Sequence, residues 1–127
     1  MAGGGSIIHN GYRANIGVNM KYLKNGNPQG SLLYIEHRPT GDVVFKSNAL
    51  GALAIVGNEA DPTGKGTLNS VGNYSFIARI IDNGEPGSSD RFGLRVTSPS
   101  GVILVDLTFD PIQLSGGNFS VPKLTGK

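Results

Sequence analysis

Hydrophobic and polar residues alternate along much of this chain with a period of two. The clearest alternation lies within residues 12–22, and it recurs over 74–81 and 91–97. Successive side chains of an extended chain point to opposite faces, so these runs predict β-strands with one buried face. A further run at 102–109 is apolar apart from Asp106. We expect these four segments to form the inner core.

Clusters of turn-forming residues separate the runs at 25–30, 39–42, 82–89 and 98–101. Glycine, proline, asparagine and aspartate favour turns because of their backbone freedom or their local hydrogen bonds. Short strands joined by such turns predict an all-β fold. We expect an antiparallel β-sandwich, or a flattened barrel, of about nine or ten short strands.

Three stretches are harder to interpret. Residues 43–46 predict a short strand, and 58–65 is polar and turn-rich. Residues 50–56 are apolar on both faces, which fits a buried strand or a short helix, and the glycines at 51 and 57 favour the strand. The glycine-led segments 3–8 and 115–120 resemble each other. They predict paired edge strands, unless both are merely common glycine-rich strand starts.

Composition narrows the class further. The 127 residues include 20 Gly, 7 Pro and no Cys, which excludes disulfides and thiolate metal sites. The length predicts a single domain, which we place at 1–122 with a disordered tail at 123–127. The net charge is only +2, and the basic residues are scattered, so we expect no nucleic-acid binding. No apolar run is long enough to insert into a membrane.

The region from residue 64 to residue 97 carries a specific pattern. It reads Gly-Lys-Gly-Thr-Leu-Asn-Ser at 64–70, Gly-Asn-Tyr-Ser-Phe at 72–76, and Asp-Asn-Gly-Glu-Pro-Gly-Ser-Ser-Asp-Arg-Phe at 82–92. This pattern resembles the post-COAP module of secreted bacterial and archaeal proteins. The chain departs from that family at Ser70, where glycine is usual, and at Gly93-Leu94, where Arg-Ile is usual.

The resemblance implies a β-sandwich in an extracellular or cell-surface protein of prokaryotic type. The family has no assigned enzymatic activity and usually lies beside other domains of a secreted chain. The resemblance therefore implies a location and an architecture more than a chemistry.

The loop at 82–90 is the densest acidic feature of the sequence. Asp82, Asn83, Glu85 and Asp90 could supply hard oxygen ligands of the kind that Ca²⁺ prefers. The spacing is not that of an EF-hand. The alternative is that Asp82 and Asp90 accept backbone hydrogen bonds within the loop. Bound Ca²⁺ is the only cofactor that the sequence indicates.

No catalytic arrangement is evident, and we expect no enzyme. His9 and His37 lack a third zinc ligand at a known spacing, and both are expected on the surface. Asp106, which with Asp110 flanks residues 107–109, favours a structural pair with Arg95 over a catalytic role. Tyr12 and Tyr34 are the aromatic residues left as candidate sugar-binding positions, although the chain has no Trp.

These observations leave three functions open. The first is a non-catalytic structural or binding module of a secreted or surface protein, whose partners are other domains of the parent chain. The second is a self-assembling surface or filament subunit that exchanges terminal strands with neighbouring subunits. The third is a carbohydrate-binding module.

Overall fold

The alternating runs form strands that pair antiparallel with one another. The computed structural model describes residues 2–9, 11–22, 28–82, 90–106, 112–114 and 116–120. Within them lie ten strands and no helix, which confirms the all-β prediction. No helix in this part of the chain is therefore long and apolar enough to cross a membrane. The strands are β1 (Ala2–His9), β2 (Tyr12–Tyr22), β3 (Pro28–Glu36), β4 (Val43–Val56), β5 (Glu59–Leu68), β6 (Val71–Ile81), β7 (Arg91–Thr97), β8 (Ile103–Asp106), β9 (Ile112–Gln113) and β10 (Gly116–Ser120).

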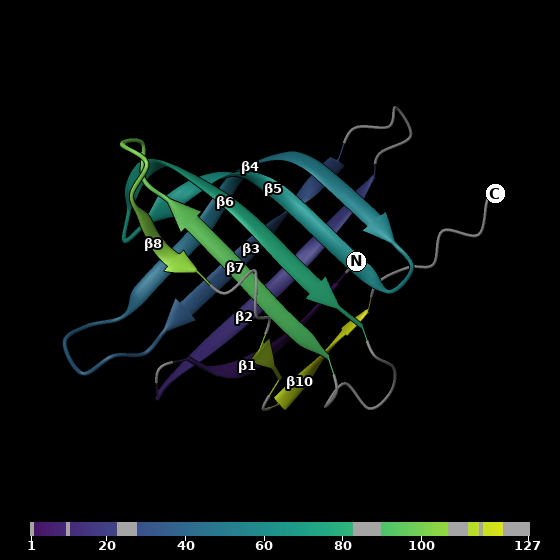
Figure 1. Ribbon diagram of the computed structural model, residues 1–127, viewed down its shortest axis with the longest axis horizontal. Coiled ribbons are helices and arrows are strands. Elements are labelled where there is room, and N and C mark those ends of the chain that lie inside the picture. The colour runs from purple at the N-terminus through teal and green to yellow at the C-terminus, as the bar shows by residue number, and fades with distance from the viewer. Residues whose placement is uncertain are drawn as a thin grey trace.

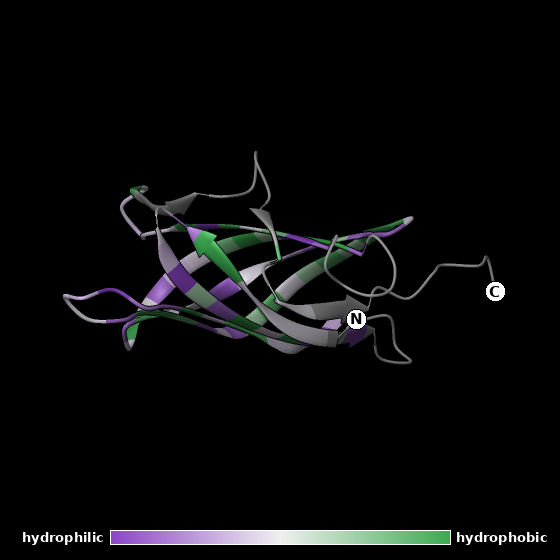
Figure 2. Ribbon diagram, turned by 90° about the horizontal axis from the view of Figure 1, so that it is seen from below, coloured by the Kyte–Doolittle hydropathy of each residue, from purple (hydrophilic) through white to green (hydrophobic). Residues whose placement is uncertain are grey.

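All ten strands belong to one curled sheet. Strands β1 to β7 each pair with the next strand of the sequence, and β10 pairs with β1. Strand β9 pairs with β7, so residues 112–120 connect the last long strand to the first. In Figure 1 the strands β5–β7 cross over β1–β3, and Figure 2 shows the two layers edge-on. This is the flattened barrel of the sequence prediction.

Strand β4 takes part in both layers. Its first residues pair with β3, whereas residues 45–56 pair with β5. Two irregularities of register, between Ser47 and Ala49 and between Leu50 and Ala52, bend the strand and shift which residues face inward. The predicted short strands at 43–46 and 50–56 are therefore one strand. Leu50, Leu53 and Ile55 pack on the core because the second bulge shifts the alternation, whereas Ala52, Ala54 and Val56 are exposed. The stretch is therefore apolar on both faces but buried on one face only.

The interior is filled by the alternate residues that the pattern predicts. Buried side chains come from β2, β6 and β7 as expected, and also from β1, β3, β4 and β5. Two aromatic contacts join the layers: Tyr34 stacks on Phe92 at 6.1 Å between ring centroids, and Phe45 meets Phe76 at 5.4 Å. Val102 is 54% exposed, contrary to the core prediction for 102–109, and the side chains of 103–109 lie outside the described residues.

The prediction of a polar turn region at 58–65 is wrong, because most of it belongs to β5. Pro62 lies opposite Leu53 of β4, and its pairing with β6 is interrupted between Ala60 and Thr63. Proline is tolerated there because its missing N–H falls in the interruption. Gly64 permits a very close approach to β4, since a Cβ atom at that position would lie 2.1 Å from the carbonyl oxygen of Ala49.

Candidate functional site

A carboxylate is buried at one end of the interior. Leu32, Tyr34 and Glu36 are alternate residues of β3, and all three face inward. The alternation of the strand therefore places the carboxyl group of Glu36 inside the barrel, where it is 1% exposed. A buried charge is costly unless partners surround it.

Three side chains donate to this carboxylate. The Tyr34 hydroxyl donates to Oε1 at 2.7 Å, and Nδ1 of His9 lies 2.7 Å from the same oxygen. The guanidinium group of Arg38 contacts Oε2 through Nε and Nη2. It also lies over the ring of Tyr12, 5.5 Å from the centroid. We call these five residues the Glu36 cluster.

Neighbouring strand ends bring the Glu36 cluster together. His9 ends β1 and pairs with Tyr12, which begins β2. Glu36 ends β3 opposite Ala14 of β2, and the chain continues directly to Arg38. The backbone N–H of His37 donates to the carbonyl oxygen of Arg13 at 2.8 Å, which holds this exit from β3 against β2.

The surroundings shift two ionisation equilibria in opposite directions. Burial by itself raises the pKa of Glu36, but the hydrogen bonds from His9, Tyr34 and Arg38 outweigh it and lower the pKa below its ordinary value. Burial, the hydrogen bond to Glu36 and the charge of Glu36 raise the pKa of Tyr34 well above its ordinary value, although the charge of Arg38 opposes this. The cluster therefore favours an ionised Glu36 beside a neutral Tyr34.

This geometry can fix the orientation of the His9 ring. A carboxylate on Nδ1 fixes the orientation of an imidazole, as in general-base pairs. Among the described residues, however, no group of three His, Cys, Asp or Glu side chains is placed to hold a metal ion. The donors around Glu36 are directed at its carboxylate, so the arrangement satisfies a buried charge and locks three strand ends together.

The sequence analysis singled out two members of this cluster for another reason. Tyr34 is fully buried, and its ring stacks on Phe92 rather than facing solvent. Tyr12 is half-buried, with Arg38 over its ring. The prediction of a surface position is wrong for His9, whose side chain is 16% exposed because it contacts Glu36. It is confirmed for His37, which is exposed.

Glu36 and Arg38 were missed in the sequence, although a signal for Glu36 was present. Glu36 continues the inward alternation of Leu32 and Tyr34, and a charged residue at such a position requires partners. The identity of those partners depended on pairing between β1, β2 and β3, which no local pattern contains.

Only part of the predicted calcium loop can be described. Asn83 and Glu85 lie outside the described residues. Asp82 is half-buried at the end of β6, and its backbone exchanges two hydrogen bonds of 2.9 Å with Asn58. Asp90 is fully buried, and its carbonyl oxygen accepts the N–H of Leu114 at 2.8 Å. Calcium binding by this loop stays a prediction.

A second charged group lies on the outer face of β5 and β6. Arg79 Nε lies 3.2 Å from Glu59 Oε2 and 3.6 Å from Asp61 Oδ1. Burial, the hydrogen bond to Asp61 and the charge of Asp61 raise the pKa of Glu59, while the charge of Arg79 lowers it. The two neighbouring carboxyl groups therefore compete for one cation.

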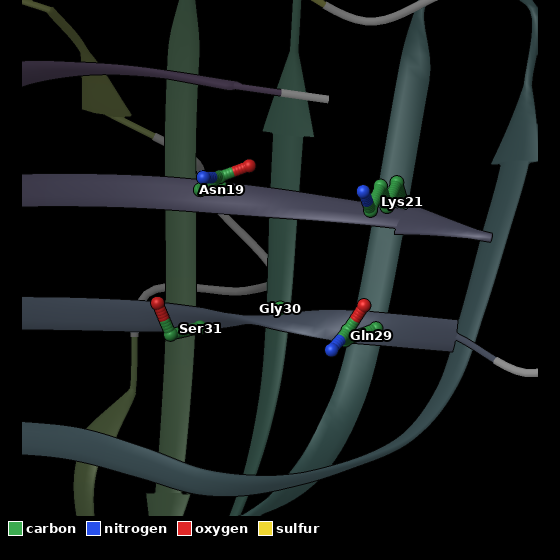
Figure 3. A pocket seen from close by; sticks show the side chains of 5 residues that line it. All are labelled: Asn19, Lys21, Gln29, Gly30 and Ser31. Carbon is green, nitrogen blue, oxygen red and sulfur yellow. The ribbon is translucent and has the colours of Figure 1, made fainter. Parts of the chain in front are cut away.

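A polar hollow of about 330 Å³ lies on the outer face of β2 and β3. Asn19 pairs with Ser31 and Lys21 with Gln29 across the two strands, and all four are exposed. Figure 3 shows these four side chains around Gly30. They offer amide, hydroxyl and ammonium groups on one surface, which suits a polar ligand.

Comparisons with known proteins decide nothing further. No family model, curated protein or solved structure matches the chain. The interpretation of the site therefore depends on the geometry given above.

Proposed function

We propose that this domain is a non-catalytic structural and binding module of a larger secreted or cell-surface protein. The observation that carries the proposal is the position of the two chain ends. Ala2 of β1 pairs with Ser120 of β10, so the ends of the fold leave it side by side. Cα atoms of paired antiparallel residues are only about 5 Å apart.

Ends that lie this close together suit a domain that projects from its parent chain better than one that holds other domains apart. An 11-residue strand such as β6 is about 35 Å long. A domain whose ends are about 5 Å apart adds almost nothing to the reach of a parent chain, and it projects from that chain as a side branch. A projecting domain presents its outer faces to partners. Among the roles of spacer, anchor and binding module, we therefore favour the binding module.

Insertion into a carrier protein tests this proposal. The whole chain is placed in an exposed hairpin loop of a monomeric carrier, and the unfolding of both parts is followed by calorimetry. We expect both to unfold cooperatively near their separate Tm values, because ends that lie together do not pull the loop apart. Loss of cooperative unfolding in either part would contradict the proposal.

A carbohydrate is the second candidate ligand class, and the polar hollow on β2 and β3 favours it. Its amide and hydroxyl groups match the hydrogen-bonding groups of a sugar. Affinity electrophoresis in gels containing a panel of polysaccharides tests it, with the double variant Asn19→Ala/Gln29→Ala. Thr63→Ala on the distant β5 is the control. If the gels still retard the double variant, the sugar-binding site does not lie in this hollow.

The extracellular location is part of the same proposal. Its basis is the resemblance of residues 64–97 to a module of secreted prokaryotic proteins. Absence of cysteine is compatible with folding in any redox compartment.

A further inference from the structure

A segment from the far end of the chain pairs with both β1 and β7. Strands β1 to β8 pair in sequence order, so their contacts form between neighbours. Residues 112–120 are different, because they pair with strands far away in the sequence. Strand β9 pairs with β7 at Arg91 and Phe92, and β10 pairs along its whole length with Ala2–Ser6 of β1. Contacts between distant parts of a chain pay the largest loop-closure cost.

The seam between β1 and β10 contains glycines on both strands, at positions 3–5 of β1 and at 116 and 117 of β10. Gly5 lies opposite Gly117, Gly4 opposite Asn118, and Ser6 opposite Gly116. A Cβ atom at Gly117 would lie 2.2 Å from the carbonyl oxygen of Gly4, so the two backbones approach as only glycine allows. A glycine contributes backbone hydrogen bonds but no side-chain packing, so glycine within a strand weakens it.

Leu114 is the apolar residue of the segment whose buried side chain the structure describes. Leu114 is 4% exposed, and its Cδ1 lies 3.2 Å from where a Cβ of Gly5 would be. Its N–H donates to the carbonyl oxygen of Asp90. The groups that make these contacts lie on β1, on β7 and at Asp90 directly before β7, and a second copy of the chain offers the same groups in the same arrangement.

We propose that the segment 112–120 exchanges between two copies of this chain. In the exchanged dimer, β10 of each copy pairs with the partner's β1, and β9 pairs with the partner's β7. The contacts within the seam are the same in monomer and dimer, so the cost of exchange is small. The proposal goes beyond the binding role, which a strictly monomeric domain would fulfil equally well.

Deleting β1 cannot test this exchange. Strand β1 pairs with β2 on one edge and β10 on the other, so its removal would disrupt the fold itself. A test must leave both strands in place and report which chain supplies each one. The absence of cysteine from the sequence makes a disulfide reporter available.

Ser6 and Gly116 are suitable positions for that reporter. They are paired residues of β1 and β10, and a Cβ at Gly116 would lie 3.7 Å from Ser6 Oγ. Paired antiparallel residues have Cα atoms about 5 Å apart, which lies within the range that a disulfide spans. The full-length single variants Ser6→Cys and Gly116→Cys are mixed, refolded over a range of concentrations, and oxidised in a glutathione buffer. The control mixture pairs Ser6→Cys with Gly72→Cys, which lies exposed on β6.

We expect a disulfide-linked heterodimer of Ser6→Cys and Gly116→Cys chains whose yield rises with concentration and exceeds the control at least fivefold. A yield no greater than the control at every concentration would overturn the proposal. Because the variants themselves could fold poorly, the unmodified protein is also refolded as a mixture of ¹⁵N-labelled and unlabelled chains. Native mass spectrometry should then show a dimer of intermediate mass, and monomers alone would overturn the exchange.

Discussion

Replacing Glu36 with glutamine tests whether the Glu36 cluster stabilises the fold through an ionised carboxylate. Glutamine keeps an oxygen that can accept a hydrogen bond from the Tyr34 hydroxyl. Its amide nitrogen, however, is itself a donor and cannot accept hydrogen bonds from the surrounding donors. Loss of one buried charge-assisted hydrogen bond costs about 2 kcal/mol. The Arg38 pair adds less than about 1 kcal/mol, because that side chain is 35% exposed and is rehydrated when the pair is lost.

We therefore expect Glu36→Gln to lower the free energy of unfolding by about 2–3 kcal/mol at pH 7. For a chain of this size, that corresponds to a fall in Tm of roughly 8–12 °C. Urea denaturation of both proteins gives the difference. The control is Glu59→Gln on the outer face. Its carboxyl group is about one-third exposed and its pKa is raised, so the change should stay within about 0.5 kcal/mol.

The dependence on pH makes this prediction specific to charge. Folding lowers the pKa of Glu36, so its stabilisation is present above the unfolded carboxyl pKa of about 4.3 and is lost as the pH falls through the lower folded pKa. The gap between wild type and Glu36→Gln should therefore narrow when unfolding is measured from pH 7 down to pH 2. Equal stability at pH 7, or a gap that does not change with pH, would refute the reasoning.

Three further changes test other parts of the structure. Tyr34→Phe should lower the free energy of unfolding by about 1 kcal/mol in urea denaturation, because Glu36 loses one hydrogen-bond donor. In the wild type, the phenolate absorbance of Tyr34 should appear only when alkali unfolds the protein. Gly64→Ala should lower stability by about 1–3 kcal/mol through its clash with Ala49, whereas Gly72→Ala, with open space around it, should change stability by less than about 0.5 kcal/mol. If the loop at 82–90 binds calcium, millimolar Ca²⁺ should raise the Tm of EDTA-treated protein by several degrees, and Glu85→Gln should abolish the rise; an unchanged Tm would assign those carboxyl groups to hydrogen bonding.

Local alternation predicted the strands well wherever it was uninterrupted. Residues 14–20 and 76–80 show every second side chain buried, as the pattern indicates. The prediction failed where bulges shift the alternation, in β4, and where a strand consists of turn-forming residues, in β5. Gly64 and Pro62 belong to β5 because of its neighbours, and their local preference alone indicates a turn.

The similarity of the two glycine-led segments at the ends of the sequence correctly predicted that β1 and β10 pair. Residues 3–6 of β1 lie against β10, as expected of paired terminal strands, although only β10 is at an edge. The Glu36 cluster could not be predicted in this way. Its donors lie on separate strands, and their meeting depends on the registers between β1, β2 and β3.

A circular permutant tests most directly the claim that the two ends of the fold leave it side by side. Lys127 is joined to Met1, and the chain is opened between Pro99 and Ser100 in an exposed turn. Strand β10 then precedes β1 in sequence as well as pairing with it. The account predicts a folded permutant whose Tm lies within a few degrees of the original, measured by circular dichroism. A permutant that fails to fold, also when the chain is opened at Gly41 instead, would contradict the side-by-side ends and the display role that depends on them.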